Sequence, residues 1–339
     1  MKLTMQEVAK EAGVSAATVS RIINGNGIVA SDKREKVLQI ITREAGKNRS
    51  VDQRKKRRVR HIGLLFLSGS EFDFRTLGIK VLNIANHLPQ GYDFHIYSPS
   101  FNAHQVESNF LRGELDGLFL IGHNAEDRFF TFLLNRIPHV WLNSHQLEGE
   151  KAVSLMGNEF AGKIAANYLI EHNCKRPAVL SFQTLHIGLL DRISGFEVNC
   201  FIHKRQARKI ELDLAKEKSY SDPIPGEGAD IETKIKKALD LIPPKEFPDG
   251  IFSPEEALTP YLYRVFQQKK IRKYPRVISC NYTPGYLRGL YPRPASIDLH
   301  PETQVKLAID ELINRIEGKN PRPDNVASFI QPELIPGED

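Results

Sequence analysis

At 339 residues with 41% hydrophobic content, the chain is long enough to bury a large core and to form two or three domains. Its three cysteines form no even disulfide framework and no paired CxxC motif, which excludes a disulfide-stapled fold and suits a reducing compartment. No apolar leader and no run of about 18 apolar residues is present, so we expect a cytoplasmic protein without a membrane partner.

The net charge of +6 is an N-terminal property. Residues 1–60 hold fifteen Lys or Arg against six Asp or Glu, whereas the rest of the chain holds 32 against 35. A basic head on a slightly acidic body predicts binding to a polyanion through one end, with an affinity that falls steeply as salt rises. A solvated charged surface is the alternative.

The first 25 residues predict two short helices joined by a tight turn. Thr4 can cap the first helix and Glu7 completes a capping box, so we expect a helix over 5–12 that ends at Gly13. Ser15 offers the cap for a second helix. The residues spaced to bury a seam between the helices are Val8, Ala9, Ala12, Val14, Val19 and Ile22. The outer face has short or hydrogen-bonding side chains, which suit a helix that enters a major groove about 12 Å wide.

The runs 6–15, 17–21 and 24–27 closely resemble the N-terminus of the LacI/GalR family of bacterial transcription repressors. A purely structural helical hairpin is the alternative. The resemblance implies a recognition helix from Ser15 to Asn24, with Ala16, Ala17 and Arg21 at positions that read bases. It also implies phosphate contacts by Thr4, Ser15, Thr18, Ser20 and Asn24, and we add Asn26 in the following turn to the predicted DNA contacts. A third helix from Ala30 or Ser31 to Glu44, with Val37, Ile40 and Ile41 inward, would complete an all-α headpiece over residues 1–46.

Residues 47–60 are basic and almost free of apolar side chains, so they predict a linker. Members of the family usually carry here a Tyr-x-Pro-Asn step and a short helix whose leucine wedges the minor groove. This chain instead has Lys47, Arg49 and Ser50 at that step, and Lys55 and Lys56 in the region of the leucine. Basic side chains neutralise phosphates but do not separate stacked bases. We therefore predict DNA contacts by Lys55 and Lys56, with weaker kinking of the operator.

Residues 61–339 alternate short apolar strands with amphipathic helices, which predicts doubly wound parallel sheets. The expected strands are 62–67, 94–97, 117–121, 139–142, 152–155, 178–181, 250–252, 277–280 and 295–298. The resemblance implies a periplasmic-binding-protein-like α/β body of two such subdomains with a ligand in the cleft between them. We expect an N-subdomain of residues 61–158 plus 291–318 and a C-subdomain of residues 159–290 plus 319–339.

Five residues are predicted to bind a small effector, because they match family positions or follow strands where specificity loops lie. Arg192 matches the arginine of an Arg-x-x-Gly-Phe step and could donate two hydrogen bonds, although a surface arginine paired with Asp191 is the alternative. Glu256 and Asn281 follow strands at positions where the family commonly has aspartate. Phe74 and Trp141 are stacking candidates, with core packing as the alternative; Phe182 and Tyr282 are further ones. Retaining the arginine while losing an aspartate favours a sugar or sugar acid.

No metal cluster, nucleophile motif or phosphate-cradling loop supports an enzyme, so we predict neither catalysis nor a cofactor. The leading prediction is a sequence-specific transcription regulator, typically a repressor, that binds a palindromic operator as a homodimer under control of the effector. A DNA-binding regulator with a vestigial or protein-controlled cleft is the first alternative. A solute-binding protein is the second, and the basic headpiece argues against it.

Overall fold

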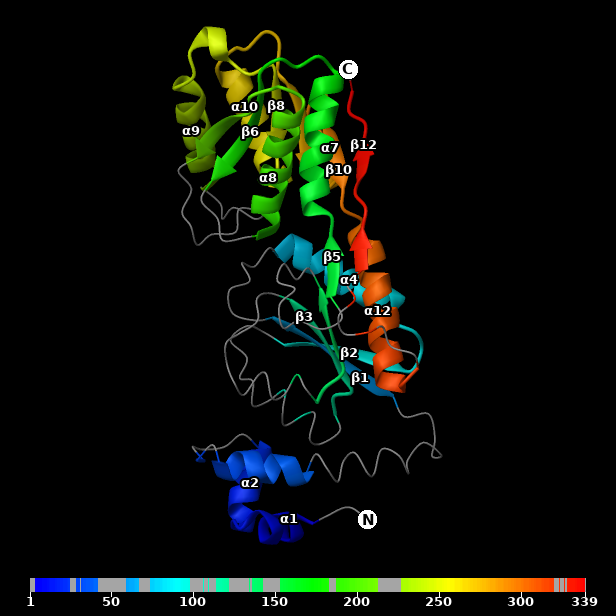
Figure 1. Ribbon diagram of the computed structural model, residues 1–339. Coiled ribbons are helices and arrows are strands. Elements are labelled where there is room, and N and C mark those ends of the chain that lie inside the picture. The colour runs from blue at the N-terminus through cyan, green and yellow to red at the C-terminus, as the bar shows by residue number, and fades with distance from the viewer. Residues whose placement is uncertain are drawn as a thin grey trace. The chain divides into compact units, whose positions relative to one another are not determined.

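Figure 1 shows the computed structural model of the chain. It describes residues 4–24, 29–30, 32–41, 59–66, 74–97, 106, 109, 114–121, 134, 136–142, 153–182, 187–212, 227–319, 323, 326 and 328–338. The chain divides into two compact units. The first comprises residues 1–70, 84–153 and 308–326, and the second comprises residues 71–83, 154–307 and 327–339.

The N-terminal residues form the predicted helix-turn-helix from α1 (Met5–Ala12) and α2 (Ala16–Asn24). The Thr4 hydroxyl accepts from the Glu7 backbone N–H at 3.3 Å, and Glu7 Oε2 accepts from the Thr4 N–H at 2.6 Å. This reciprocal pair confirms the capping box. Gly13 ends α1 with a φ of 69°, a left-handed conformation that glycine adopts without strain.

A small apolar core holds the headpiece together. Residues 32–41 are helical, which confirms the third helix over that range; the expected continuation to Glu44 lies outside the described residues. The core joins residues from all three helices, namely Val8, Ala9, Val19, Ile22, Val37, Leu38 and Ile40. The expected seam is therefore confirmed, with Ala12, Val14 and Ile41 packed partly buried against it.

The first sheet has six strands in the order β11-β5-β4-β3-β1-β2. Its strands are β1 (Arg60–Phe66), β2 (Tyr92–Tyr97), β3 (Gly117–Ile121), β4 (His139–Leu142), β5 (Val153–Met156) and β11 (Ser328–Ile330). β1 pairs in parallel with both β2 and β3. Helix α4 (Phe74–His87) follows β1, and α12 (Pro301–Glu317) packs against β3, where a Cβ on Gly117 would lie 2.7 Å from Ile316 Cδ1.

The second sheet has the order β12-β10-β9-β8-β6-β7. Its strands are β6 (Pro177–Phe182), β7 (Arg208–Leu212), β8 (Gly250–Ser253), β9 (Arg276–Cys280), β10 (Ala295–Asp298) and β12 (Glu333–Ile335). All pair in parallel except β12, which runs antiparallel to β10. The helices of this unit are α7 (Asn158–Glu171), α8 (Ile187–Ile202), α9 (Glu227–Asp240), α10 (Thr259–Gln268) and α11 (Pro284–Leu287), with 3₁₀ turns η2 (Pro244–Glu246) and η3 (Glu256–Leu258).

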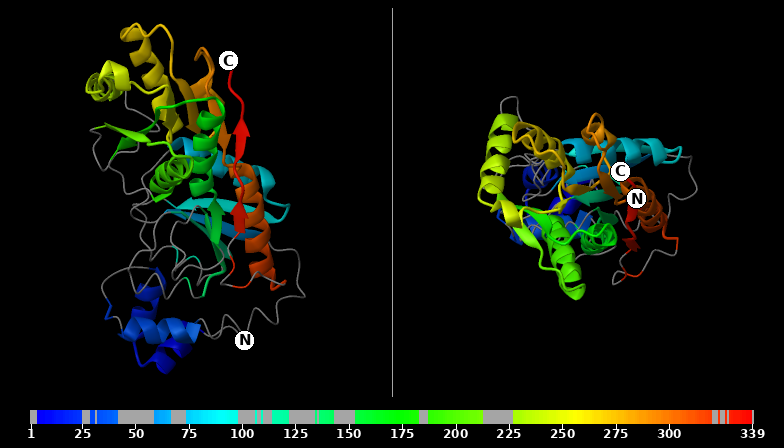
Figure 2. Two further views of the ribbon diagram at one scale, coloured as in Figure 1. Left: turned by 45° about the horizontal axis from the view of Figure 1, so that its top comes forward. Right: turned by 90° about the horizontal axis from the view of Figure 1, so that it is seen from above.

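Helices α7 and α8 lie side by side, as the views in Figures 1 and 2 show, because two glycines allow their backbones to touch. A Cβ on Gly162 would lie 2.1 Å from the Arg192 carbonyl oxygen, and a Cβ on Gly195 would lie 2.1 Å from that of Glu159. No side chain fits at either position. This close approach brings the start of α7 next to the first turns of α8.

All nine predicted strands occur within two residues of their expected bounds, and β7, β11 and β12 are additional to them. Several predicted boundaries differ from the two units. Residues 71–83, 154–158 and 291–307 belong to the second unit. The last of these ranges includes β10, which pairs with β9 through Ala295 and Ile278. Residues 319–326 in turn belong to the first unit, and the predicted linker ends one residue inside β1, which starts at Arg60.

Candidate DNA-binding surface and effector cluster

Helix α2 presents its predicted base-reading residues to solvent. Ala16, Ala17 and Arg21 are all exposed, whereas Val19 on the opposite side is fully buried. The Ser15 hydroxyl accepts from the Thr18 N–H at 3.1 Å, so Ser15 caps α2 as predicted. The cap fixes where the helix begins and thereby which side chains its first turn presents.

The residues predicted to contact phosphate differ in their exposure and in the hydrogen bonds they already form. Ser15, Thr18 and Ser20 are exposed or half-buried. The Thr4 hydroxyl and backbone N–H are both engaged by Glu7 Oε2, at 2.9 Å and 2.6 Å. Those hydrogen bonds lower the pKa of Glu7, which keeps a negative charge beside Thr4. A phosphate oxygen would have to displace Glu7 from Thr4. The side chain of Asn24, and residues Asn26, Lys55 and Lys56, lie outside the described residues.

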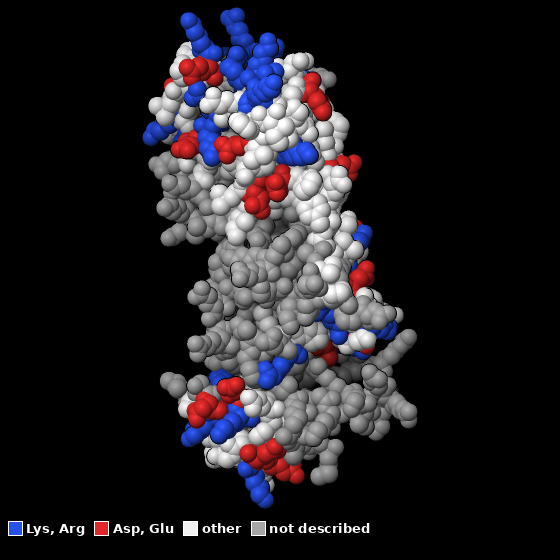
Figure 3. Space-filling model, in the orientation of Figure 1, with Lys and Arg blue, Asp and Glu red and all other residues white. Residues whose placement is uncertain are grey.

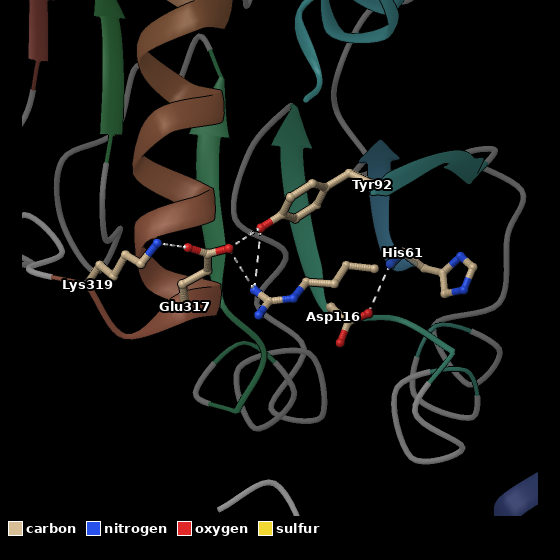
Figure 4. Close-up of polar contacts among 6 residues, drawn as sticks. His61, Tyr92, Asp116, Glu317 and Lys319 are labelled. Atoms are coloured by element: carbon tan, nitrogen blue, oxygen red, sulfur yellow. Dashed lines mark hydrogen bonds and ion pairs between the residues drawn. The ribbon is translucent and has the colours of Figure 1, made fainter. Parts of the chain in front are cut away.

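A polar network anchors the first unit where the linker enters it (Figure 4). Tyr92 donates to Glu317 Oε1 at 2.9 Å, Arg60 Nη1 lies 3.5 Å from the same oxygen, and Lys319 is paired with Glu317 Oε2. Burial and the Glu317 hydrogen bond raise the pKa of Tyr92 to about 12, while Lys319 lowers the pKa of Glu317. The first residue of β1 is thus tied to the end of α12.

In the second unit, Arg192 is buried and is not a surface arginine. It is 5% exposed; its Nε donates to Asn158 Oδ1 at 2.9 Å and its Nη1 donates to the Pro254 carbonyl at 2.7 Å. Among the described residues, no ion pair joins it to Asp191. These two bonds hold the guanidinium at the carboxyl end of β8. Its Nη2 group forms no hydrogen bond with any described residue.

Glu256, predicted to accept hydrogen bonds from an effector, is instead an interior residue. It is 0% exposed, and Oε1 accepts from the hydroxyls of Ser279, at 2.6 Å, and of Ser296. Oε2 accepts from the Thr283 backbone N–H. Burial raises the pKa of Glu256, and these hydrogen bonds oppose that rise. With its oxygens engaged and no exposed surface, the carboxylate joins β9 to β10 through Ser279 and Ser296.

Asn281 lies at the end of β9, where the chain turns sharply. Asn281 and Tyr282 have φ values of 120° and 48°, and the Tyr282 N–H donates to Ser296 Oγ at 3.1 Å. The Asn281 amide donates to Glu255 Oε1 at 3.4 Å. Glu255, which is half-buried, also accepts from the Ala257 N–H, so it caps η3. Positive φ at two successive non-glycine residues is strain that the neighbouring hydrogen bonds sustain.

The predicted stacking residues are mostly core. Trp141 in β4 is 1% exposed and Phe182 in β6 is 7% exposed, so both side chains are part of the buried core. Core packing was the alternative to ligand stacking for these residues. Tyr282 is exposed beside Asn281. The side chain of Phe74 lies outside the described residues. Ligand contact by Phe74, Trp141, Arg192, Glu256 and Asn281 remains a prediction.

The headpiece geometry agrees with comparisons to known proteins. Residues 4–45 match the family model for bacterial regulatory proteins of the lacI family. The ribose operon repressor of Haemophilus influenzae is 23% identical over 340 residues, a match that covers 98% of this chain and 97% of the repressor. The chain is thus similar to the LacI/GalR family in its helix-turn-helix segment and to a bacterial repressor over nearly its full length.

Solved structures show the same fold over nearly the whole chain. A complex of the transcriptional regulator CelR with cellobiose superposes with a TM-score of 0.60 at 20% identity, covering 99% of both chains. The Lac repressor dimer bound to operator and an anti-inducer superposes with a TM-score of 0.60 at 16% identity, covering 100% of this chain and 99% of that one.

Inspection of the sequence missed residues that organise the polar network around Arg192, Glu256 and Asn281, which we call the effector cluster after its predicted role. These are Asn158, Glu255, Ser279, Thr283 and Ser296. The two serines carried a usable signal, because each interrupts an apolar strand with a hydroxyl that needs a partner when buried. In the part of the chain that the structure describes, no helix is long and apolar enough to cross a bilayer.

Proposed function

We propose that this protein is a sequence-specific transcription repressor that reads a palindromic operator as a homodimer. The observation that carries the proposal is the capped α2 helix, which keeps Ala16, Ala17 and Arg21 exposed on one element. Two alanines offer apolar contact to a thymine methyl, and an arginine suits the O6 and N7 acceptors of guanine. Operator DNA in a bacterium lies in the cytoplasm, which is where we place the protein. We assign it no catalytic role.

Selection of bound fragments from the source genome at fixed salt, followed by titration of the best site, tests this function. We expect a palindromic site bound at least about 1000-fold more tightly than random DNA. Binding that is sensitive to salt but indifferent to sequence would contradict the proposal. A single half-site would contradict the dimer.

We further propose that a small polyol, a sugar or sugar acid, controls DNA binding through the second unit. CelR was solved with cellobiose, and the matched repressor in Haemophilus influenzae acts on a ribose operon. In this chain the Nη2 group of Arg192, which bonds to no described residue, and the Asn281 amide supply donors. A panel of sugars and sugar acids should include one that raises the unfolding free energy by about 2.7 kcal/mol at 100 times its dissociation constant.

The internal role of Glu256 favours a second candidate, a DNA-binding regulator without a small effector. Its carboxylate, which would accept from sugar hydroxyls, is engaged by Ser279, Ser296 and Thr283. If no compound in the panel changes stability or operator affinity, this second candidate replaces the first.

A further inference from the structure

One end of the second unit has a charge pattern that DNA reading by the headpiece does not use. The segments 171–176, 203–209, 243–249 and 269–276 lead into β6, β7, β8 and β9. The parallel register pairs Ala178 with Arg208, Pro177 with Gly250, and Gly250 with Arg276, so the segments share one edge of the sheet. We call them the basic end face. Figure 3 shows Lys and Arg side chains gathered at the end of this unit drawn at the top.

The basic end face carries a large excess of positive charge. Its four segments hold twelve Lys or Arg and three Asp or Glu. Residues 61–339 hold 32 basic and 35 acidic residues, so without these segments they would hold 20 and 32. The slightly acidic body is therefore a strongly acidic body with one basic end, and the charge is segregated rather than mixed.

Two of the three acidic residues of the basic end face, Glu246 and Asp249, join its loops. Asp249 Oδ2 and Oδ1 accept from the backbone N–H groups of Lys175 at 3.0 Å and Arg176 at 2.8 Å, and Glu246 pairs with Arg208. Seven exposed basic residues form no ion pair with any described residue, namely Lys175, Lys204, Arg205, Lys245, Lys270, Arg272 and Lys273. The loops are thus fixed while most of the positive charge stays available.

Large apolar side chains border the same charges. Phe201 and Ile202, the last residues of α8, are 81% and 65% exposed, and Leu241, which follows α9, is 84% exposed. Ile202 directly precedes the segment 203–209, and Leu241 lies two residues before the segment 243–249. Protein interfaces typically combine aromatic or aliphatic anchors with a charged rim that steers the partner.

We propose that the basic end face docks an acidic segment of a partner protein that presents aliphatic or aromatic side chains between its carboxylates. Charge complementarity favours an acidic partner, because seven cations have no acidic partner among the described residues. The exposed apolar residues favour a protein over a nucleic acid. A phosphodiester backbone would neutralise the lysines but would leave Ile202 and Leu241 in water.

The test uses the full chain and three labelled probes, with binding followed by fluorescence anisotropy. The first probe is a peptide of repeated Asp-Phe-Glu-Leu units, the second replaces Phe and Leu by Ser at the same charge, and the third is a duplex of random DNA. We expect the first peptide to bind at least about tenfold more tightly than the second. Equal binding of the two peptides would overturn the proposal.

Two sets of substitutions locate the binding. The apolar set is Phe201→Ser, Ile202→Ser and Leu241→Ser, and the charge set is Lys204→Gln, Arg205→Gln and Lys273→Gln. Each set should weaken the first peptide about tenfold and leave random DNA unaffected. The matched controls, Tyr291→Ser and Lys163→Gln, are also exposed but lie outside the basic end face and should change neither.

The binding results distinguish an acidic protein segment from a nucleic acid on the basic end face. Loss of random-DNA affinity in the charge set, equal to the loss for the peptide, would show a nucleic-acid surface and overturn the proposal. All substituted residues are exposed, so the variants keep the core of the unit, and equal melting temperatures check this. Operator binding depends on the headpiece and is measured separately, so failure of this proposal is distinguishable from failure of the repressor function.

Discussion

The headpiece and the effector cluster use polar residues in opposite ways. In the headpiece, Thr4 and Ser15 cap the helices, and Arg21 remains in solvent, free to bind. In the effector cluster, Glu256 and Arg192 are buried. Most of their polar atoms already form hydrogen bonds within the protein, for example with Ser279 and with the Pro254 carbonyl. A residue of the expected type at a family position is therefore not necessarily available to bind a ligand. Burial and existing partners decide whether a polar group can bind a ligand.

Among these substitutions, removal of the Glu256 carboxylate should lower the free energy of unfolding most. It tests directly whether Glu256 stabilises the fold or binds a ligand. Glu256→Ala leaves the hydroxyls of Ser279 and Ser296 and the Thr283 N–H without their charged acceptor, so unfolding should become easier by about 4 kcal/mol. Urea denaturation measures the loss. Glu256→Gln, which keeps one acceptor oxygen, should cost less. A Glu256→Ala protein that unfolds like the wild type but loses a sugar ligand would show that Glu256 binds the effector.

The contact between α7 and α8 offers a second way to test whether the cluster is rigidly built. Gly162→Ala places a methyl group against the Arg192 carbonyl, so it should destabilise the second unit by about 3 kcal/mol. Gly285→Ala is the matched control, since a Cβ there meets nothing within 4 Å. Thermal unfolding of both variants measures the difference. Equal stabilities would mean that the helices can separate without cost.

Substitution of Arg21 tests whether the exposed polar residues of the headpiece bind DNA. Arg21→Ala should cost about 1 to 3 kcal/mol on the selected operator and relax the preference at one base position, without changing stability. Lys10→Ala, on the exposed side of α1, serves as the control. Titration of operator and random DNA at the same salt concentration separates the two roles. Equal losses on both DNAs would assign Arg21 to a phosphate.

The smallest expected effect concerns pH and the Thr4 capping box. The folded state lowers the pKa of Glu7, so its stabilising contribution is present above the ordinary pKa of glutamate and is lost as pH falls through the lowered value. Backbone amide resonances of α1 in isotope-labelled protein should shift over that acid range. In Glu7→Gln the shift should disappear. A titration identical in both proteins would place the change elsewhere.

Much of the fold could be predicted because the signals are local. The Thr4 and Glu7 capping box, the Gly13 turn and the apolar seam each depend on residues within one or two helical turns. Apolar runs likewise located nine strands. β7 was missed because Arg208–Leu212 carries three charged residues and has only two apolar side chains, Ile210 and Leu212, to bury. The predicted assignment of residues 291–318 to the N-subdomain failed in part, since β10 pairs with β9 in the second sheet.

The headpiece, the parallel-sheet class and the resemblance to the LacI/GalR family could be predicted from the sequence, because caps, periodicity and motif spacing are properties of short segments. The folded structure was needed to show that Glu256 is internal, that Trp141 is core and that twelve scattered basic residues share one edge of a sheet. Those facts depend on which strands pair and which helices touch. Residues such as Glu256 and Ser296, 40 positions apart, meet only after the sheet has assembled.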